Sequence, residues 1–234
     1  MSDQTRDPES TPSGSGSPQD LASRLLSPFV QLLPVAGASL SVAAGSSQST
    51  VGATDAIAAQ LEQLQFDLGE GPHWDALRGG REVLVPDVRE GRSTWPVFAG
   101  EVAALDVGAV FAFPLTLGAV TVGVVDLYRS TPGVLSPGDV STARSLAVVA
   151  AAPAIQIAAR AASQEGPPDG ASTAELRRVV HQATGMLLVQ LGVTATEAFA
   201  RLRAHAFASG VPLELVAQDV VARRLTFRDE NATE

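Results

Sequence analysis

Polar side chains that can contact nucleic acid gather between residues 177 and 185. They recur at helical spacing: Arg177, Arg178, His181, Gln182, Thr184 and Gly185. Arginine and glutamine can contact phosphates and base edges, and an imidazole can stack on a base. A second predicted helix adds Arg203 to one side. The pattern predicts a polar, cationic helix face that binds RNA or DNA, with an ordinary solvated face as the alternative interpretation.

Gly185 is an unusual residue for the middle of this predicted helix. A glycine there costs about 1 kcal/mol relative to alanine. Two explanations are open: close packing of a neighbouring helix, or the close approach of a bulky partner.

The familiar enzymatic motifs are missing from the sequence. It contains no phosphate-binding GxxxxGK[ST], no GxSxG and no HExxH stretch. Its three histidines, His73, His181 and His205, lie far apart along the chain, and there is no cysteine to act as a metal ligand or nucleophile. We therefore expect a protein that is not an enzyme, with no catalytic residues, no metal and no cofactor.

The segment 67–75, DLGEGPHWD, is the one unusual stretch of the first half. Two glycines and a proline restrict its backbone path, and an imidazole and an indole stand beside them. One interpretation is the wall of a small-molecule pocket formed by Gly71, His73 and Trp74. The other is a connecting loop whose Trp74 seals the core.

Charge is distributed unevenly along the chain. The net charge is −9, yet residues 171–228 hold seven Arg against four acidic residues, while residues 1–170 hold nine Arg against eighteen. All the basic residues are arginine and none is lysine. A basic module therefore follows an acidic one, and the basic module is the candidate for binding a polyanion.

Hydrophobic periodicity predicts an α+β domain over residues 20–163. Strands are expected at 35–43, 48–53, 82–85, 108–117 and 120–128, with helices at 20–33, from 55 to about 65, from 94, and over 136–163. Strands that are neighbours in sequence favour an antiparallel sheet flanked by helices. Residues 66–80 are expected to be irregular, 1–19 a disordered tail and 164–172 a linker.

Residues 173–228 predict a small all-α domain of three helices, followed by a tail at 229–234. The first helix carries an apolar stripe that includes Val180, Ala183 and Leu187. Thr194 and Glu197 form a capping-box pattern at the start of the second helix. Pro212 opens the third helix.

The first domain resembles a GAF domain of actinobacterial regulators over about residues 20–163. The resemblance rests on LGEGP (68–72), VPDV (85–88), TWPVFAG (94–100), FPL (113–115) and VGVVDLY (122–128). It implies a central antiparallel sheet with helices on both sides, and a role in sensing small molecules or in dimerisation. Many relatives carry cysteine where this chain has His73.

Residues 173–228 resemble an ANTAR domain. The shared features are Ala183, Gly185, Met186-Leu187, Gly192, Glu197-Ala198-Phe199, Leu202-Arg203, Ala206 and Val216-Ala217. Relatives usually carry lysine where this chain has Thr184. The resemblance implies a dimer that binds tandem hairpins in nascent RNA and so prevents a downstream terminator from forming.

Sequence and resemblance together predict a transcription antitermination regulator that binds RNA. We expect it to be cytoplasmic, not membrane-associated and homodimeric through the alanine-rich helix 136–163, with an unidentified small molecule as a candidate ligand of the GAF-like domain. The alternative is a scaffold regulator whose C-terminal module docks an acidic protein partner.

Overall fold

The structure, a computed structural model, describes residues 17–44, 47–164 and 173–227. In chain order its elements are α1 (Pro18–Leu32), β1 (Gly37–Ala44), β2 (Ser47–Ala53), α2 (Ala56–Leu68), α3 (Pro72–Gly79), β3 (Val83–Val85), η1 (Val88–Ser93), α4 (Pro96–Glu101), η2 (Val102–Ala104), β4 (Ala109–Leu117), β5 (Val120–Arg129), α5 (Pro137–Gln164), α6 (Thr173–Leu191), α7 (Ala195–Ser209) and α8 (Leu213–Val221). Most of the predicted tails and linker lies outside the described residues, although α1 begins two residues before the predicted boundary.

The five strands form one antiparallel sheet in the order β2-β1-β5-β4-β3, which confirms the predicted sheet type. Successive side chains of a strand point to opposite faces, so each strand serves two layers. Leu40 of β1 belongs to the core on one face, whereas Ser39 and Ser41 alternate with it. Ser39 pairs with Asp126 of β5, which places a set of polar residues on the second face of the sheet.

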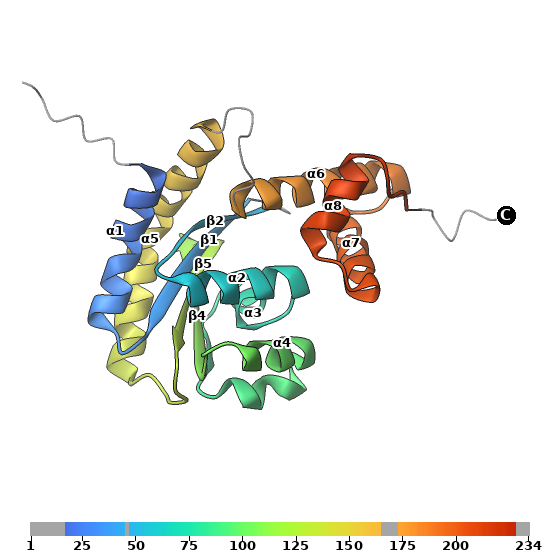
Figure 1. Ribbon diagram of the computed structural model, residues 1–234. Helices are drawn as coiled ribbons and strands as arrows, with labels where there is room; N and C mark the ends of the chain where they lie inside the picture. The colour runs from blue at the N-terminus through green and yellow to red at the C-terminus, as the bar shows by residue number, and fades with distance from the viewer. Residues whose placement is uncertain (1–16, 45–46, 165–172, 228–234) are drawn as a thin grey trace, which may run out of the picture.

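Helices α1 and α5 cover the first face of the sheet (Figure 1). Small residues of α5, among them Ala147 and Ala151, are buried against the sheet core. By length and composition alone, residues 137–162 of α5 could cross a membrane. One face of this helix packs on the sheet and on α1.

Helices α2, α3 and α4 cover the second face (Figure 1). The prediction of an irregular stretch over 66–80 is wrong, because α2 continues to Leu68 and α3 occupies Pro72–Gly79. Gly69 ends α2 in the left-handed conformation, with φ of 60°. Pro72 then starts α3 at a position where its missing N–H costs little. Tertiary contacts stabilise α3, since its Ala76 is fully buried beside the sheet.

Helices α6, α7 and α8 form the predicted three-helix module, with a core of their own. The predicted stripe of α6 is confirmed, because Val180, Ala183 and Leu187 are all fully buried. The capping box of α7 is present as well: Thr194 Oγ1 accepts from the Glu197 N–H, and the Glu197 carboxylate accepts from the Thr194 N–H. The module lies beside α2 and the β2 edge of the sheet, away from α1 and α5 (Figure 1).

Candidate functional site

A buried polar cluster centred on His73 lies between α3 and the sheet. His73 Nδ1 is 2.5 Å from Asp126 Oδ2, and its Nε2 is 2.5 Å from Gln48 Nε2. A carboxylate can only accept, so Nδ1 donates to Asp126, while Nε2 faces the side-chain amide of Gln48. Gln48 Nε2 also donates to Ser41 Oγ at 2.9 Å.

The cluster contains the three residue types of a hydrolytic triad, arranged so that His73 lies between Ser41 and Asp126. The surroundings of these residues do not suit catalysis. Ser41 Oγ is 3.5 Å from His73 Nε2, and the Gln48 amide occupies that nitrogen at shorter range. All three side chains are no more than 2% exposed. A nucleophile must reach its substrate, and Ser41 is closed to solvent in this structure.

Gln65 organises the residues that the sequence singled out as a pocket wall. Its Oε1 accepts from the His73 N–H at 2.9 Å, and its backbone carbonyl accepts from Trp74 Nε1 at 2.6 Å. Gly71 has φ of 124°, and a Cβ there would lie 2.6 Å from Gln65 Oε1. Gly71, His73 and Trp74 are thus brought together around a buried glutamine that sequence reasoning missed.

Four buried side-chain atoms among the described residues have no hydrogen-bond partner: Ser39 Oγ, Gln48 Oε1, Gln65 Nε2 and Asp126 Oδ1. They all belong to residues of this cluster or adjacent to it. An unsatisfied buried polar atom costs about 1–3 kcal/mol. The cluster therefore contains buried hydrogen-bond donors and acceptors that no protein group satisfies.

The predicted cationic face of α6 is divided between two environments. Thr184 is buried, with its hydroxyl donating to Val180 O at 2.8 Å. The prediction that it lies on an exposed face is wrong, because position 184 is one turn from both Val180 and Leu187 and so falls on the buried stripe. Arg177 and Arg178 belong to α6, but their side chains lie outside the described residues.

His181 and Arg203 lie against the N-terminal domain. His181 Nε2 is 3.0 Å from the backbone oxygen of Gln48 and 3.3 Å from its nitrogen. The guanidinium of Arg203 lies 5.6 Å from the centre of the Phe199 ring. Burial lowers the pKa of Arg203 from its ordinary value, and the Glu70 carboxylate opposes that shift.

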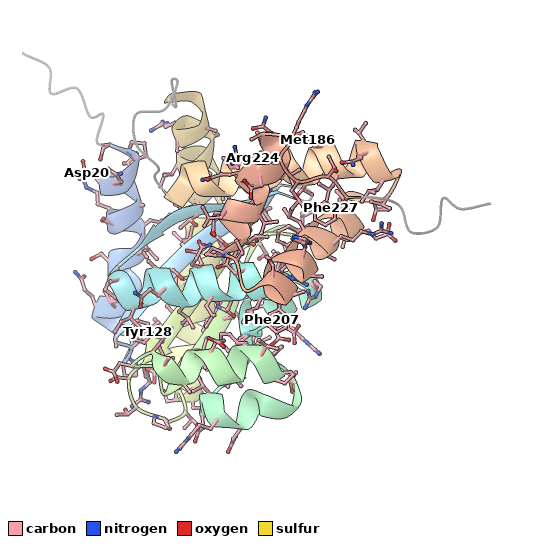
Figure 2. All side chains as sticks on the ribbon, turned by 45° about the vertical axis from the view of Figure 1, so that its right-hand side comes forward. Asp20, Tyr128, Met186, Phe207, Arg224 and Phe227 are labelled. Atoms are coloured by element: carbon pink, nitrogen blue, oxygen red, sulfur yellow. The ribbon has the colours of Figure 1, made fainter. Side chains whose placement is uncertain are left out.

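Gln182 and Gly185 are exposed, on the side of α6 that faces away from the N-terminal domain. No atom lies within 4 Å of where a Gly185 Cβ would be, so close helix packing does not explain this glycine. A surface groove of about 570 Å³ runs beside it, lined by Gln182, Gly185, Met186, Val189, Val220 and Arg223. Met186 marks the groove at one end of the module, far from Phe207 at the other (Figure 2).

Phe66 of α2 joins the two domains. Its side chain is 2% exposed and belongs to the core cluster of the three-helix module. Its ring centre lies 5.5 Å from that of Phe199 and 6.3 Å from that of His181. Gln63, one turn earlier, donates to Glu214 of α8 at 2.6 Å. Sequence reasoning missed this contact, since an aromatic residue on α2 is equally consistent with the core of its own domain.

An open cavity of about 650 Å³ lies at the same contact. The N-terminal domain lines it with Leu68, Glu70 and Val97, and the module contributes Arg203 and Phe207. Phe207 is 70% exposed at its end of α7 (Figure 2).

Comparison with known proteins agrees with this two-part organisation. The GAF domain profile matches residues 15–152 and the ANTAR domain profile matches residues 171–221. No curated protein sequence matches the chain significantly.

Solved structures resemble the N-terminal part. A domain of a two-component sensor histidine kinase from Sinorhizobium meliloti 1021 has a TM-score of 0.48 and 16% identity, covering 65% of this chain and 100% of that one. A type II free methionine-R-sulfoxide reductase from Thermoplasma acidophilum has a TM-score of 0.44 and 13% identity, covering 59% and 94%. The chain belongs to the GAF domain family, and its GAF domain is followed by an ANTAR domain in a two-domain GAF–ANTAR architecture.

Proposed function

We propose that this protein is a transcription antitermination regulator whose ANTAR domain binds hairpins in nascent RNA under the control of its GAF domain. The match of residues 171–221 to the ANTAR profile carries the proposal. The excess of arginine over acidic residues in 171–228 supports it, because cations release counterions from a phosphate backbone. The loop of a hairpin exposes bases that side chains can stack on and pair with.

The proposed RNA contacts are residues singled out by the sequence: Arg177, Arg178, His181, Gln182, Gly185 and Arg203. Thr184 is left out, because its side chain is buried. The groove beside Gly185 supports the exposed part of this set, since a glycine without packing neighbours lets a partner approach the helix backbone. Arg223 contributes a cation to the same groove.

Binding of the full chain to a two-hairpin RNA, measured over a range of salt concentrations, tests this function. The Arg177→Ala/Arg178→Ala variant is expected to bind at least tenfold more weakly and to lose about one unit of salt slope for each phosphate contact. An Arg24→Ala/Arg81→Ala variant removes the same charge from the GAF domain and is the matched control. Equal losses in both variants would place the RNA contacts away from Arg177 and Arg178. No hairpin binding at low salt would count against RNA and favour a protein partner.

We propose further that α5 forms the seam of a homodimer. Its exposed residues recur at alternating spacings of four and three: Ser141, Ser145, Val148, Ala152 and Ile155. This is the spacing of a coiled-coil seam, and small residues allow close approach. Val148 is 53% and Val149 72% exposed, although both are apolar.

Sedimentation of a Val148→Glu/Ile155→Glu variant tests the seam. It is expected to sediment as a monomer under conditions in which the parent chain and a Gln156→Glu control are dimers. A variant that remains dimeric would place the interface elsewhere.

We propose that the GAF domain senses a small polar molecule at the His73 cluster. The four unsatisfied buried atoms there offer hydrogen-bond capacity that a polar ligand could use. A ligand found by thermal shift should stabilise the parent chain and stabilise Asp126→Asn much less. Equal stabilisation of both proteins would place the ligand at another site.

A further inference from the structure

The contact between the GAF and ANTAR domains covers part of the proposed RNA face. Phe66 packs into the core of the module, where its ring meets both His181 and Phe199. His181 is also held at the Gln48 backbone, and Arg203 is half-buried beside α2. These contacts come from β2 and α2, two adjacent elements of the GAF domain.

Gly69 and Arg203 fit one another closely. A Cβ at Gly69 would lie 1.3 Å from Arg203 Nη1, so the guanidinium occupies the space that any other residue at 69 would fill. Gly69 is the left-handed cap at the carboxyl end of α2, where the helix carbonyls carry partial negative charge. The C-terminal end of α2 therefore fits the Arg203 guanidinium in shape and attracts its positive charge.

Gln48 connects the contact to the interior of the GAF domain. Its side chain donates to Ser41 and contacts His73 within the buried cluster, while its backbone meets His181 of the module. The side chain of Gln48 thus contacts the cluster proposed to sense a ligand, and its backbone contacts the helix proposed to bind RNA. A shift of the Gln48 side chain would act on the β2 backbone that holds His181.

Thr184 suits its place on the buried stripe of α6. The residue is 6% exposed, and its hydroxyl is satisfied within α6. The lysine that related ANTAR domains usually carry there would bury an ammonium group, which is unfavourable without a partner.

We propose that the docking of α6 and α7 on α2 and β2 is an intramolecular lock, in which the GAF domain and RNA compete for the same face of the ANTAR domain. The inference rests on the proposed RNA-binding function. In the locked state His181 and Arg203 are covered, while Gln182 and Gly185 remain exposed. The apparent RNA affinity is then reduced by the fraction of molecules that are closed.

Cross-linking tests the lock in the full chain, which contains no native cysteine. A Gln63→Cys/Glu214→Cys variant places thiols at the two sides of the interdomain hydrogen bond. A short bismaleimide should join them, and the cross-linked protein should bind hairpin RNA at least tenfold more weakly than the same variant before cross-linking. A Glu82→Cys/Arg144→Cys variant replaces a contacting pair inside the GAF domain, and its cross-link should leave RNA affinity unchanged.

Phe66→Ala provides the opposite perturbation. It should raise hydrogen exchange along α2 and α7 and strengthen hairpin binding about tenfold or more, because the open fraction rises. Phe29→Leu removes a buried aromatic ring from the GAF core at α1, on the face of the sheet away from the contact, and controls for general destabilisation. Gln63→Ala weakens the contact without a core cavity and should act in the same direction as Phe66→Ala.

The outcomes separate the lock from the RNA function. Failure of the interdomain thiols to cross-link would refute docking, whatever the RNA result. Efficient cross-linking with unchanged RNA affinity would refute competition. If no variant and not even the parent chain bound hairpin RNA, both the proposed function and the proposed competition would be refuted. The cross-link would still show whether the two domains dock.

Discussion

Replacing Gly185 with alanine should stabilise the ANTAR domain and weaken its binding to RNA. The residue lies in mid-α6 and is exposed, and a Cβ there would have no atom within 4 Å. Alanine in place of glycine inside an exposed helix contributes about 1 kcal/mol. For a domain of this size the melting temperature should rise by roughly 4–8 °C.

The same methyl group should obstruct an RNA that approaches the α6 backbone. We expect a loss of at least about tenfold in hairpin affinity, which corresponds to about 1.4 kcal/mol. Gly100→Ala is the matched control, because Gly100 is an exposed helical glycine of α4, also with no atom within 4 Å of its Cβ position. It should stabilise its own domain and leave RNA binding unchanged.

Urea denaturation followed by circular dichroism gives the stability change, and a hairpin titration of the same preparation gives the affinity. A destabilised Gly185→Ala protein would refute the structural reasoning, since it would mean that another surface packs on this glycine. A stabilised protein with unchanged RNA affinity would show that RNA does not approach α6 at Gly185.

Three further predictions concern the interior and the domain contact. Gly69→Ala should cost about 1–2 kcal/mol for its left-handed backbone and should also displace Arg203, which urea denaturation and a drop in interdomain cross-linking would detect. His73→Ala should cost roughly 3–5 kcal/mol by leaving the buried Asp126 carboxylate without its partner, whereas Asp126→Asn keeps an acceptor and should cost far less in the same denaturation assay. Burial is the main cause that raises the pKa of Tyr128 from 10.0 to about 12. The folded state thus favours the neutral phenol, and the resulting stability should be present below pH 10 and disappear as the pH rises from 10 to 12. Absorbance titration can follow this, because Tyr128 is the only tyrosine of the chain, and stability of a Tyr128→Phe variant should lack this pH dependence.

Local sequence signals were enough to predict most of the secondary structure. Asp55 caps α2 through the Ala58 N–H, and Thr194 and Glu197 cap α7, because such caps depend only on residues three positions apart. The α3 helix at Pro72–Gly79 was missed. It is only eight residues long and is bounded by glycines, so its stability comes from burial beside the sheet and not from its own propensity.

The candidate site was predicted only in part. Gly71, His73 and Trp74 do lie close together, as predicted. The residue that accepts hydrogen bonds from His73 and Trp74 is Gln65. It lies on a different helix, α2, where it is buried together with Leu61 and Phe66. Nothing local to Gln65 distinguishes a buried glutamine from one at the surface.

The sequence by itself determined the two fold classes, the helix caps and the basic character of the C-terminal module, because these follow from composition and from spacings of a few residues. Only the tertiary structure decided that Thr184 is buried, that Phe66 packs into the second domain and that Gln48 meets His181. The last pair is separated by more than a hundred positions in the chain. Such contacts depend on how two finished domains fit together, and neither periodicity nor propensity along the chain encodes that fit.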